Sequence, residues 1–152
     1  MSIFSNHKHE DYTIIIGCGR LGANLANALS DEGANILIID GDEKAFNKLS
    51  PSFGGITLHG DATDFQILNN AEIGNATTVV VVTNDDNTNI LIAQIAKEIF
   101  NIKHVIARLY DPEKECVYHE FGIDTICPAI LSAKEIDKIL HMTPAGAGGG
   151  KQ

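Results

Sequence analysis

The stretch YTIIIGCGRLGANLANALSDEGANILIID, residues Tyr12 to Asp40, decides the fold. It places a glycine-rich turn, G-x-G-x-x-G over residues 17–22, between an apolar run and a segment with helical periodicity. The pattern alone is weak evidence, but a strand before it and a helix after it are the context that the motif requires. The stretch therefore predicts the opening strand, turn and helix of an α/β domain that holds a phosphate-bearing ligand.

Each glycine of this turn has an expected role beside a pyrophosphate. Gly17 permits the tight turn, Gly19 lets the backbone approach the phosphates, and Gly22 lets the helix pack closely on the strand. The phosphates would then meet free N–H groups and the positive end of the helix dipole. Arg20 is placed to reach a terminal phosphate. The candidate nucleotide-binding residues of the turn are Gly17, Cys18, Gly19, Arg20, Leu21 and Gly22.

An acidic residue stands at the end of the second apolar run. Asp40 lies 18 residues beyond Gly22 and can accept hydrogen bonds from both hydroxyls of a ribose. A carboxylate at this place repels a 2′-phosphate, so the pattern favours NAD or another adenine nucleotide over NADP. A glycine turn that binds no ligand stays open as the alternative.

Apolar runs alternate with helix-like segments along the chain. The runs are short and continuously apolar, as expected for strands covered on both faces of a parallel sheet. We expect strands at residues 12–16, 36–39, 56–59, 77–82, 104–107 and 124–126. We expect helices at residues 21–31, 43–49, 65–71, 87–100, 112–121 and 129–142. The alternation predicts a doubly wound α/β Rossmann fold with a six-stranded parallel sheet in the order 3-2-1-4-5-6.

The chain of 152 residues is long enough for one well-buried domain. We expect a polar leader at residues 1–11, a nucleotide-binding domain at 12–142, and a flexible glycine-rich tail at 143–152. The last helix, 129–142, has no later strand to return to. It either lies on the sheet or extends to another subunit, and the sequence leaves both open.

Composition narrows the classes of partner. The formal net charge of −9 argues against nucleic acid and anionic membrane surfaces, because an acidic surface repels phosphates. The apolar runs are too short to span a bilayer, and the first residues contain no apolar core of signal-peptide length. The three scattered cysteines are typical of reduced thiols, not of a disulfide framework or zinc site. We therefore expect a cytoplasmic protein.

Further candidates follow the third, fourth and fifth runs. Asp61 could accept from an adenine amino group beside Ala62, or else Asp61 or Thr63 caps the next helix. Thr83 and Asn84 end the fourth run, on the ligand side of the sheet, although Asn84 could be only a turn residue.

Arg108 ends the fifth run. A guanidinium at the mouth of an acidic domain is a good partner for a phosphate, and pairing with a nearby aspartate is the alternative.

Several motifs occur together in the order and spacing of a known family. They are IIIGCGRLGANLANAL, IIDGDEKAF, LHGDATDFQIL, VVVVTNDDNTNILIAQIAKE, VIARLYDP and FGIDTICPAILSAKEI. Over residues 12–140 the chain resembles the nucleotide-binding subdomain of regulators of potassium conductance, the RCK or KTN proteins, which include TrkA-type subunits. The resemblance implies a regulatory subunit that is not an enzyme, which binds NAD(H), ATP, ADP or AMP. It also implies a homodimer or higher homo-oligomer beneath a membrane potassium channel or transporter.

The resemblance assigns roles by matching motif. Phosphates would lie against Gly17, Gly19, Arg20, Gly22 and Arg108, the ribose against Asp40 and Asp42, and the base against Asp61, Ala62 and Thr63. The final helix resembles the family's crossover helix, which packs on a partner subunit. Many members continue into a second subdomain, before which this chain stops. Some relatives place an acid after the proline of the last motif to help hold a cation, where this chain has Ala129.

An enzyme is the main alternative, specifically an NAD-dependent oxidoreductase. Tyr110 and Lys114 match the Tyr-x-x-x-Lys pair of short-chain dehydrogenases, in which the lysine lowers the pKa of the phenol. Here the pair straddles Pro112 after the fifth run, whereas in that family it lies on a helix after the fourth. A nucleotide sensor with a partner unrelated to potassium, or an assembly module without a nucleotide, also stays open.

Overall fold

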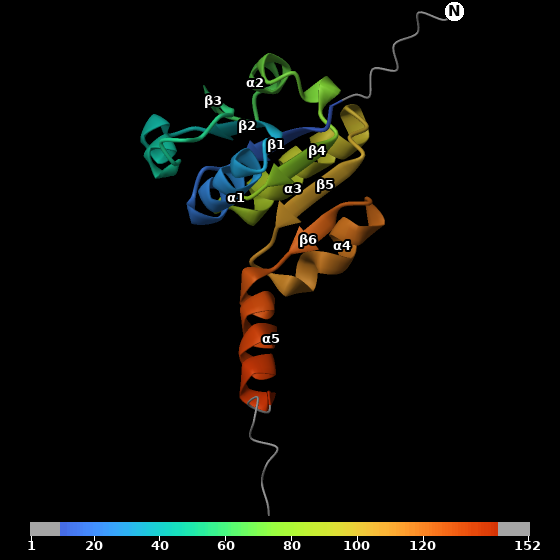
Figure 1. The fold of residues 1–152 in the computed structure, drawn as a ribbon. Helices are drawn as coiled ribbons and strands as arrows, with labels where there is room; N and C mark the ends of the chain where they lie inside the picture. Colours follow the sequence, from blue (N-terminus) through green and yellow to red (C-terminus); the bar gives the residue numbers. More distant parts are fainter. Residues whose placement is uncertain (1–9, 143–152) are drawn as a thin grey trace, which may run out of the picture.

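The fold is built on one sheet of six parallel strands. The computed structural model describes residues 10–142 of the chain, so the predicted tail and residues 1–9 of the predicted leader lie outside the described residues. The strands are β1 (Tyr12–Ile16), β2 (Asn35–Asp40), β3 (Ile56–His59), β4 (Thr78–Val81), β5 (His104–Arg108) and β6 (Asp124–Ile126). Their order is β3-β2-β1-β4-β5-β6, which confirms the predicted Rossmann topology (Figure 1).

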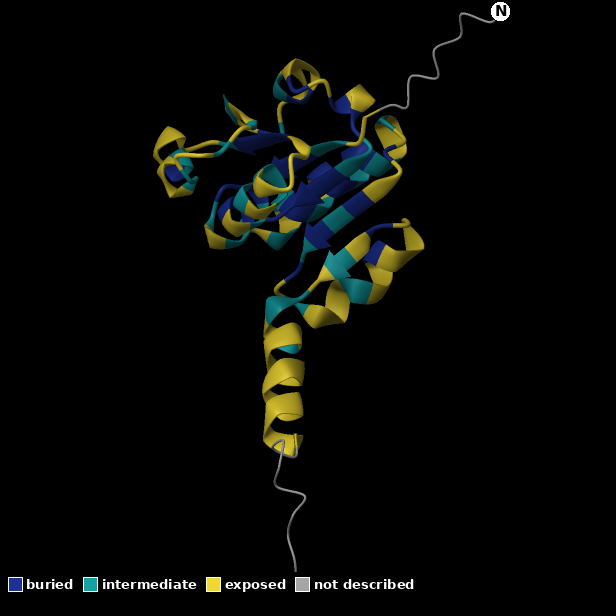
Figure 2. Cartoon of the chain, viewed as in Figure 1, coloured by how far each residue is buried: buried dark blue, intermediate teal, exposed yellow. Residues whose placement is uncertain are grey.

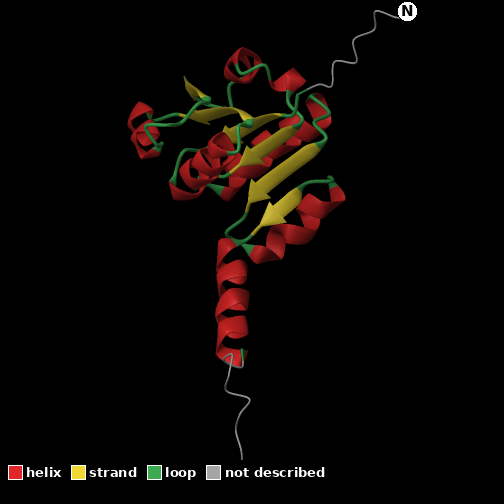
Figure 3. Ribbon diagram, in the orientation of Figure 1, coloured by secondary structure: helices red, strands yellow, loops and turns green. Residues whose placement is uncertain are grey.

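Helical segments connect successive strands (Figure 3). The α-helices are α1 (Arg20–Asp31), α2 (Phe65–Asn70), α3 (Asp86–Gln94), α4 (Glu115–Glu120) and α5 (Pro128–His141). Shorter helical segments are η1 (Glu43–Lys48), η2 (Ile73–Asn75), η3 (Ile95–Ile99) and η4 (Pro112–Lys114). The segment predicted at 43–49 is thus a 3-10 helix, η1, and the turn η2 was not predicted.

The helix predicted at 87–100 differs at both ends. Asp85 is its N-cap and accepts a hydrogen bond from the Thr88 N–H, so α3 begins at Asp86. The last part, η3, is a π-helix, in which the Phe100 N–H reaches back five residues to the Ile95 carbonyl at 3.3 Å. The wider turn is a local change in winding and not a break in the helix.

Side chains of the central strands alternate between two layers of core. Ile14 and Ile16 face the layer under α2, α3 and α4, while Ile15 faces the layer under α1 and η1. All three are at most 2% exposed, and burying a side chain of this size contributes about 1.5–3 kcal/mol. Figure 2 shows the buried residues concentrated in the sheet and on the helix faces against it. The continuous apolar runs of the sequence are explained by this two-sided burial.

The last helix, α5, extends away from the sheet (Figures 1 and 2). It contains no buried residue, and its apolar side chains Ile136, Ile139 and Leu140 are 59%, 60% and 74% exposed. Of the two positions that the sequence left open, lying on the sheet is therefore wrong for this helix.

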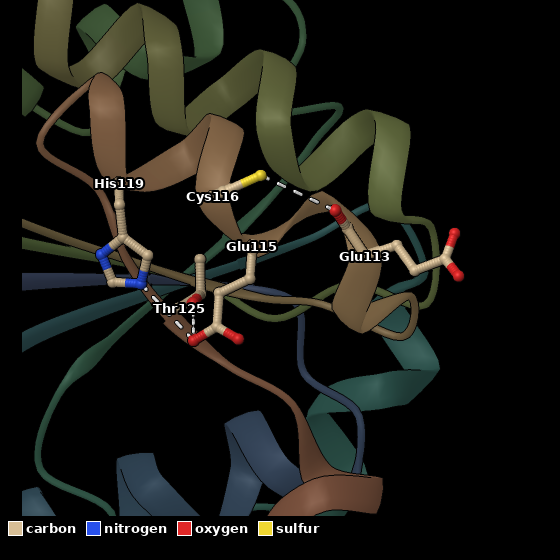
Figure 4. A network of polar contacts seen from close by, with 5 residues as sticks. All are labelled: Glu113, Glu115, Cys116, His119 and Thr125. Carbon is tan, nitrogen blue, oxygen red and sulfur yellow. Dashed lines mark hydrogen bonds and ion pairs between the residues drawn. The ribbon is translucent and has the colours of Figure 1, made fainter.

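Polar side chains fasten α4 to β6 (Figure 4). Glu115 Oε1 lies 3.4 Å from both Thr125 Oγ1 on β6 and His119 Nε2 one turn along α4. On the same helix, Cys116 Sγ lies 3.9 Å from the Glu113 carbonyl oxygen.

Within residues 10–142, no helix combines the length and the apolar composition needed to cross a bilayer.

Candidate nucleotide-binding cleft

A cleft of about 660 Å³ opens at the carboxyl ends of β1, β2, β3 and β4. This edge of a doubly wound sheet, where the strand order reverses, is where such folds bind ligands. The cleft brings together many of the predicted residues. Those that line it are Gly17, Cys18, Gly19, Asp40, Asp42, Asp61, Ala62, Thr83 and Asn84. Arg20, Leu21, Gly22, Thr63 and Arg108 lie outside its lining.

The glycine turn joins β1 to α1 by close backbone packing. Gly17 has a φ of +105°, which side-chain-bearing residues rarely adopt, and its N–H donates to the Ile39 carbonyl at 2.9 Å. A Cβ on Gly22 would lie 1.8 Å from the Gly17 carbonyl oxygen, so no larger residue fits there. Gly22 therefore allows α1 to pack against the backbone of the turn, although it does not line the cleft.

The start of α1 presents its backbone to the cleft. Gly19 is the N-cap residue, no side chain caps the helix, and a Cβ on Gly19 would meet no atom within 4 Å. The first N–H groups of any helix lack intrahelical acceptors, and the helix dipole adds a partial positive charge there. Arg20 is exposed at the first position of α1, and Leu21 packs against the core layer under this helix. An anion in the cleft would meet this helix end directly.

Asp40 uses its two carboxylate oxygens to join the glycine turn to the start of the segment after β2. Its Oδ2 accepts from the Cys18 N–H and its Oδ1 accepts from the Asp42 N–H, each at 2.7 Å. A carboxylate has about four acceptor sites, so capacity remains for ribose hydroxyls. The residue predicted to recognise the ribose thus also fixes the shape of the turn.

Lys48 is a cleft residue that the sequence did not reveal. It ends η1, lines the cleft, and its Nζ lies 3.4 Å from the Cys18 carbonyl oxygen. The buried Cys18 thiol donates to the Ala45 carbonyl at 3.4 Å. Burial, with the nearby Asp40 carboxylate, raises the pKa of Cys18, and the Lys48 charge partly opposes the rise. Lys44 and Lys48 look equivalent in the sequence, and only the path of η1 distinguishes them.

The segment after β3 is organised around Asp61. The N–H and the hydroxyl of Thr63 donate to Asp61 Oδ1 at 2.9 and 2.7 Å. These bonds lower the pKa of Asp61, whose side chain is exposed at the cleft. The following helix, α2, is capped by Asp64, which accepts from the Gln66 N–H at 2.9 Å. Capping by Asp61 or Thr63, an alternative from the sequence, is therefore wrong.

A buried amide joins the ends of β4 and β5. Asn89 on α3 is fully buried, and its Oδ1 accepts from the N–H and the hydroxyl of Thr83. Its Nδ2 donates to the carbonyl oxygens of Thr83 and Arg108, each at 3.0 Å. Asn89 thereby holds Thr83 at the cleft. This role could not be predicted from the sequence, because an asparagine among the polar residues that begin a helix is equally consistent with a side chain that faces solvent.

The guanidinium of Arg108 is held by neighbouring oxygens. Its Nη2 donates to the Thr83 carbonyl and to Asn84 Oδ1, each at 2.8 Å. Its Cζ lies 4.9 Å from the centre of the Tyr110 ring, a cation–π distance, and its buried Nε has no hydrogen-bond partner. The sequence left open a phosphate contact or an aspartate pair. The observed partners are a carbonyl and an amide.

Within residues 10–142, no group of three His, Cys, Asp or Glu side chains is placed so that it could hold a metal ion. The residues of the Tyr-x-x-x-Lys match, Tyr110 and Lys114, do not line the cleft. His59, the last residue of β3, lies with its Nε2 3.0 Å from the Gly41 carbonyl oxygen.

Residues 13–128 match the sequence model of the TrkA-N domain. The chain belongs to the TrkA-N family. It is 37% identical over 136 residues to the Trk system potassium uptake protein TrkA of Streptomyces coelicolor, covering 90% of this chain and 60% of that protein. It is 34% identical to a TrkA homologue of Pyrococcus horikoshii, covering 82% of this chain and 55% of that protein. The chain thus spans less than two thirds of the length of these relatives.

Solved structures of this family share the fold. The GsuK channel bound to NAD is 29% identical with a TM-score of 0.73, covering 86% of this chain and 23% of that one. GsuK bound to ADP is 28% identical with the same TM-score, covering 89% of this chain and 35% of that one. The TrkA-N domain of the inner membrane protein ybaL from Escherichia coli, at 17% identity and a TM-score of 0.78, supports the fold alone. It covers 86% of this chain and 97% of that domain.

Proposed function

We propose that this chain is the nucleotide-binding part of a cytoplasmic regulatory subunit that modulates a potassium channel or transporter. Its ligand would be an adenine nucleotide, either NAD(H) or AMP, ADP or ATP. The observation that carries the proposal is the tie between Asp40 and the glycine turn, which aligns a ribose acceptor with an open helix N-terminus. Relatives named as potassium uptake proteins, and GsuK structures with ADP and NAD, support it.

The cleft divides into three parts along the proposed ligand. The glycine turn would contact the phosphates, and the exposed Arg20, just outside the lining, would reach a terminal phosphate. Asp40 and Asp42 would accept from the ribose hydroxyls. Asp61 and Ala62 would lie against the base, with Thr63 orienting the Asp61 carboxylate. Lys48 adds a cation near the turn, and Thr83 and Asn84, which also line the cleft, would border the phosphates.

We propose binding without catalysis. The residues that suggested an oxidoreductase, Tyr110 and Lys114, stand away from the cleft lining. The Streptomyces coelicolor relative is named for potassium uptake, and a structural neighbour at 29% identity is an RCK domain.

Regulation would act as a shift between conformations. Ligands that differ at the phosphate or nicotinamide end would engage Arg20 and Arg108 differently, and only such a difference in affinity can shift an equilibrium. We propose that α5, with its exposed apolar residues, packs on a second copy of the chain and transmits this shift within a homo-oligomer.

The test is calorimetric titration of the full chain with NADH, NAD, ATP, ADP and AMP. We expect binding of at least one of these ligands, and Asp40→Ala should weaken it by about 1.5–3 kcal/mol, the worth of hydrogen bonds to a charged group. Asp31→Ala, an exposed acid at the other end of α1, is the matched control and should bind as the parent does. Failure of every nucleotide to bind would overturn the proposal.

A further inference from the structure

Tyr110 lies at a junction between three elements. Its N–H donates to Asp86 Oδ1 at the start of α3, at 2.8 Å. Its ring lies under the guanidinium of Arg108, the last residue of β5. Its carbonyl oxygen lies 3.9 Å from Sγ of Cys127, the N-cap residue of α5. One residue thus contacts the cleft side of the sheet and the base of the projecting helix.

The backbone beside Tyr110 strengthens this junction. The Leu109 N–H donates to the Ile126 carbonyl at 2.8 Å, which joins the end of β5 to the end of β6. Cys127 and α5 follow directly after Ile126. Tyr110 therefore directly follows a residue whose N–H is bound one position before Cys127, the N-cap residue of α5.

The other end of the junction reaches the cleft. Arg108 Nη2 binds the Thr83 carbonyl and Asn84 Oδ1, and both of these residues line the cleft. Both acceptors are neutral, and the buried Nε of Arg108 has no partner. A phosphate accepts a guanidinium hydrogen bond more strongly than a neutral oxygen does, because the charges attract and the planar fork fits two phosphate oxygens. A phosphate near Asn84 would compete for the guanidinium.

We propose that Arg108 is a two-position latch that couples a phosphate-bearing ligand in the cleft to the base of α5 through Tyr110. In the position seen here, Arg108 holds Thr83 and Asn84 and stacks on Tyr110. In the other, it binds the ligand phosphate and leaves the ring. Tyr110 then loses one of its three contacts, and the Cys127 thiol beside its carbonyl changes its surroundings. This proposal rests on the proposed nucleotide binding. It assigns the coupling between the bound nucleotide and α5 to Arg108, Tyr110 and Cys127.

The chain carries its own reporter for this change. Cys127 is half-buried at the base of α5, Cys18 is fully buried, and Cys116 is exposed on α4 (Figure 4). In a Cys116→Ser chain, the rate at which Cys127 reacts with dithionitrobenzoate can be followed, and peptide mass spectrometry confirms the labelled residue. We expect ATP, ADP, AMP or NADH, whichever binds, to change this rate about fivefold or more, a common size for coupling between sites. Adenosine, which has no phosphate, should leave the rate unchanged.

Tyr110→Leu in the same background separates coupling from binding. Tyr110 does not line the cleft, and without its ring Arg108 loses no cation–π contact when it turns to a phosphate, so the nucleotide should bind at least as tightly by calorimetry, while the Cys127 rate no longer responds to it. Phe65→Leu, which replaces an aromatic residue 46% exposed on α2, is the matched control and should keep the response. Bound nucleotide that leaves the Cys127 rate unchanged in the parent, or changes it equally in Tyr110→Leu, would overturn the latch alone. Absence of nucleotide binding would overturn the proposed function and the latch with it.

Discussion

The first and last α-helices both leave the sheet at the carboxyl end of a strand, yet they meet opposite surroundings. α1 buries Gly22, Ala23 and Ala26 against its own sheet, whereas α5 buries no residue. Both sequences are amphipathic. Amphipathicity shows that a helix face needs a partner, but not whether the partner belongs to the same domain. The comparison separates residues that stabilise this fold from residues available for contacts outside it.

The largest expected effect concerns the packing of α1. Gly22→Ala would place a methyl group 1.8 Å from the Gly17 carbonyl oxygen, and the backbone would have to move. We expect a loss of about 3 kcal/mol or more in the free energy of unfolding, measured by urea denaturation. Gly19→Ala, where the added carbon meets no atom within 4 Å, is the matched control and should cost less than about 1 kcal/mol. Equal losses in both would mean that α1 is not packed as described.

A smaller loss is expected where α3 holds two strand ends. Asn89→Leu removes the partner of the Thr83 N–H, the side-chain donor to the Arg108 carbonyl, and one of the two side-chain donors to the Thr83 carbonyl, at a buried position. Unsatisfied buried groups cost about 1–3 kcal/mol, so we expect destabilisation in that range and weaker nucleotide binding through a displaced Thr83. Asn87→Leu, on the exposed side of the same helix, should stay within about 0.5 kcal/mol. An Asn89→Leu protein as stable as the parent would contradict the role given to this amide.

Tyr12 offers a test at the edge of the sheet opposite the cleft. Its hydroxyl donates to the Ala71 carbonyl, and burial, with the nearby Glu72 charge, raises its pKa to about 12. Tyr12→Phe should cost about 1 kcal/mol near neutral pH, the usual net worth of one hydrogen bond.

The pH dependence of this contribution has a definite sign. The folded state holds the Tyr12 proton more tightly, so the stabilisation is fully present below the unfolded pKa of about 10. It is lost as the pH rises through about 12. Chemical denaturation between pH 9 and pH 12 (roughly the window set by these two values) should show a steeper fall for the parent than for Tyr12→Phe. Parallel curves would mean that the phenol is not held as described.

The smallest effect on folding is expected in α5. Ile136→Ser combined with Leu140→Ser removes two exposed apolar side chains on one face of the helix. In a solution dilute enough for the protein to be monomeric, the free energy of unfolding of the double variant should differ from that of the parent by less than about 0.5 kcal/mol. The mass in solution should fall from that of an oligomer to that of a monomer, while Lys134→Ser leaves it unchanged. A large loss of monomer stability would show that α5 packs on its own sheet.

The same contrast explains how far the sequence could predict the structure. Strand order and the glycine turn followed from local patterns, since each apolar run and each small residue has one place in a doubly wound sheet. The direction of α5 did not follow, because its apolar face fits either a sheet or a second subunit. The partners of Arg108 and the approach of Lys48 to the turn depend on side chains brought together from separate elements. Hydrophobic periodicity in the sequence does not predict such contacts between side chains of separate elements.

The double use of Asp40 limits how the specificity of this cleft can change. Its carboxylate already holds the Cys18 and Asp42 N–H groups, so the cleft keeps its shape before any ligand arrives. Admission of a 2′-phosphate would require a neutral or basic residue at this position. That replacement would also release the glycine turn. A change of specificity toward NADP would therefore need a second substitution that restores the turn, because replacing Asp40 alone would remove both the proposed ribose acceptor and the bond to the Cys18 N–H.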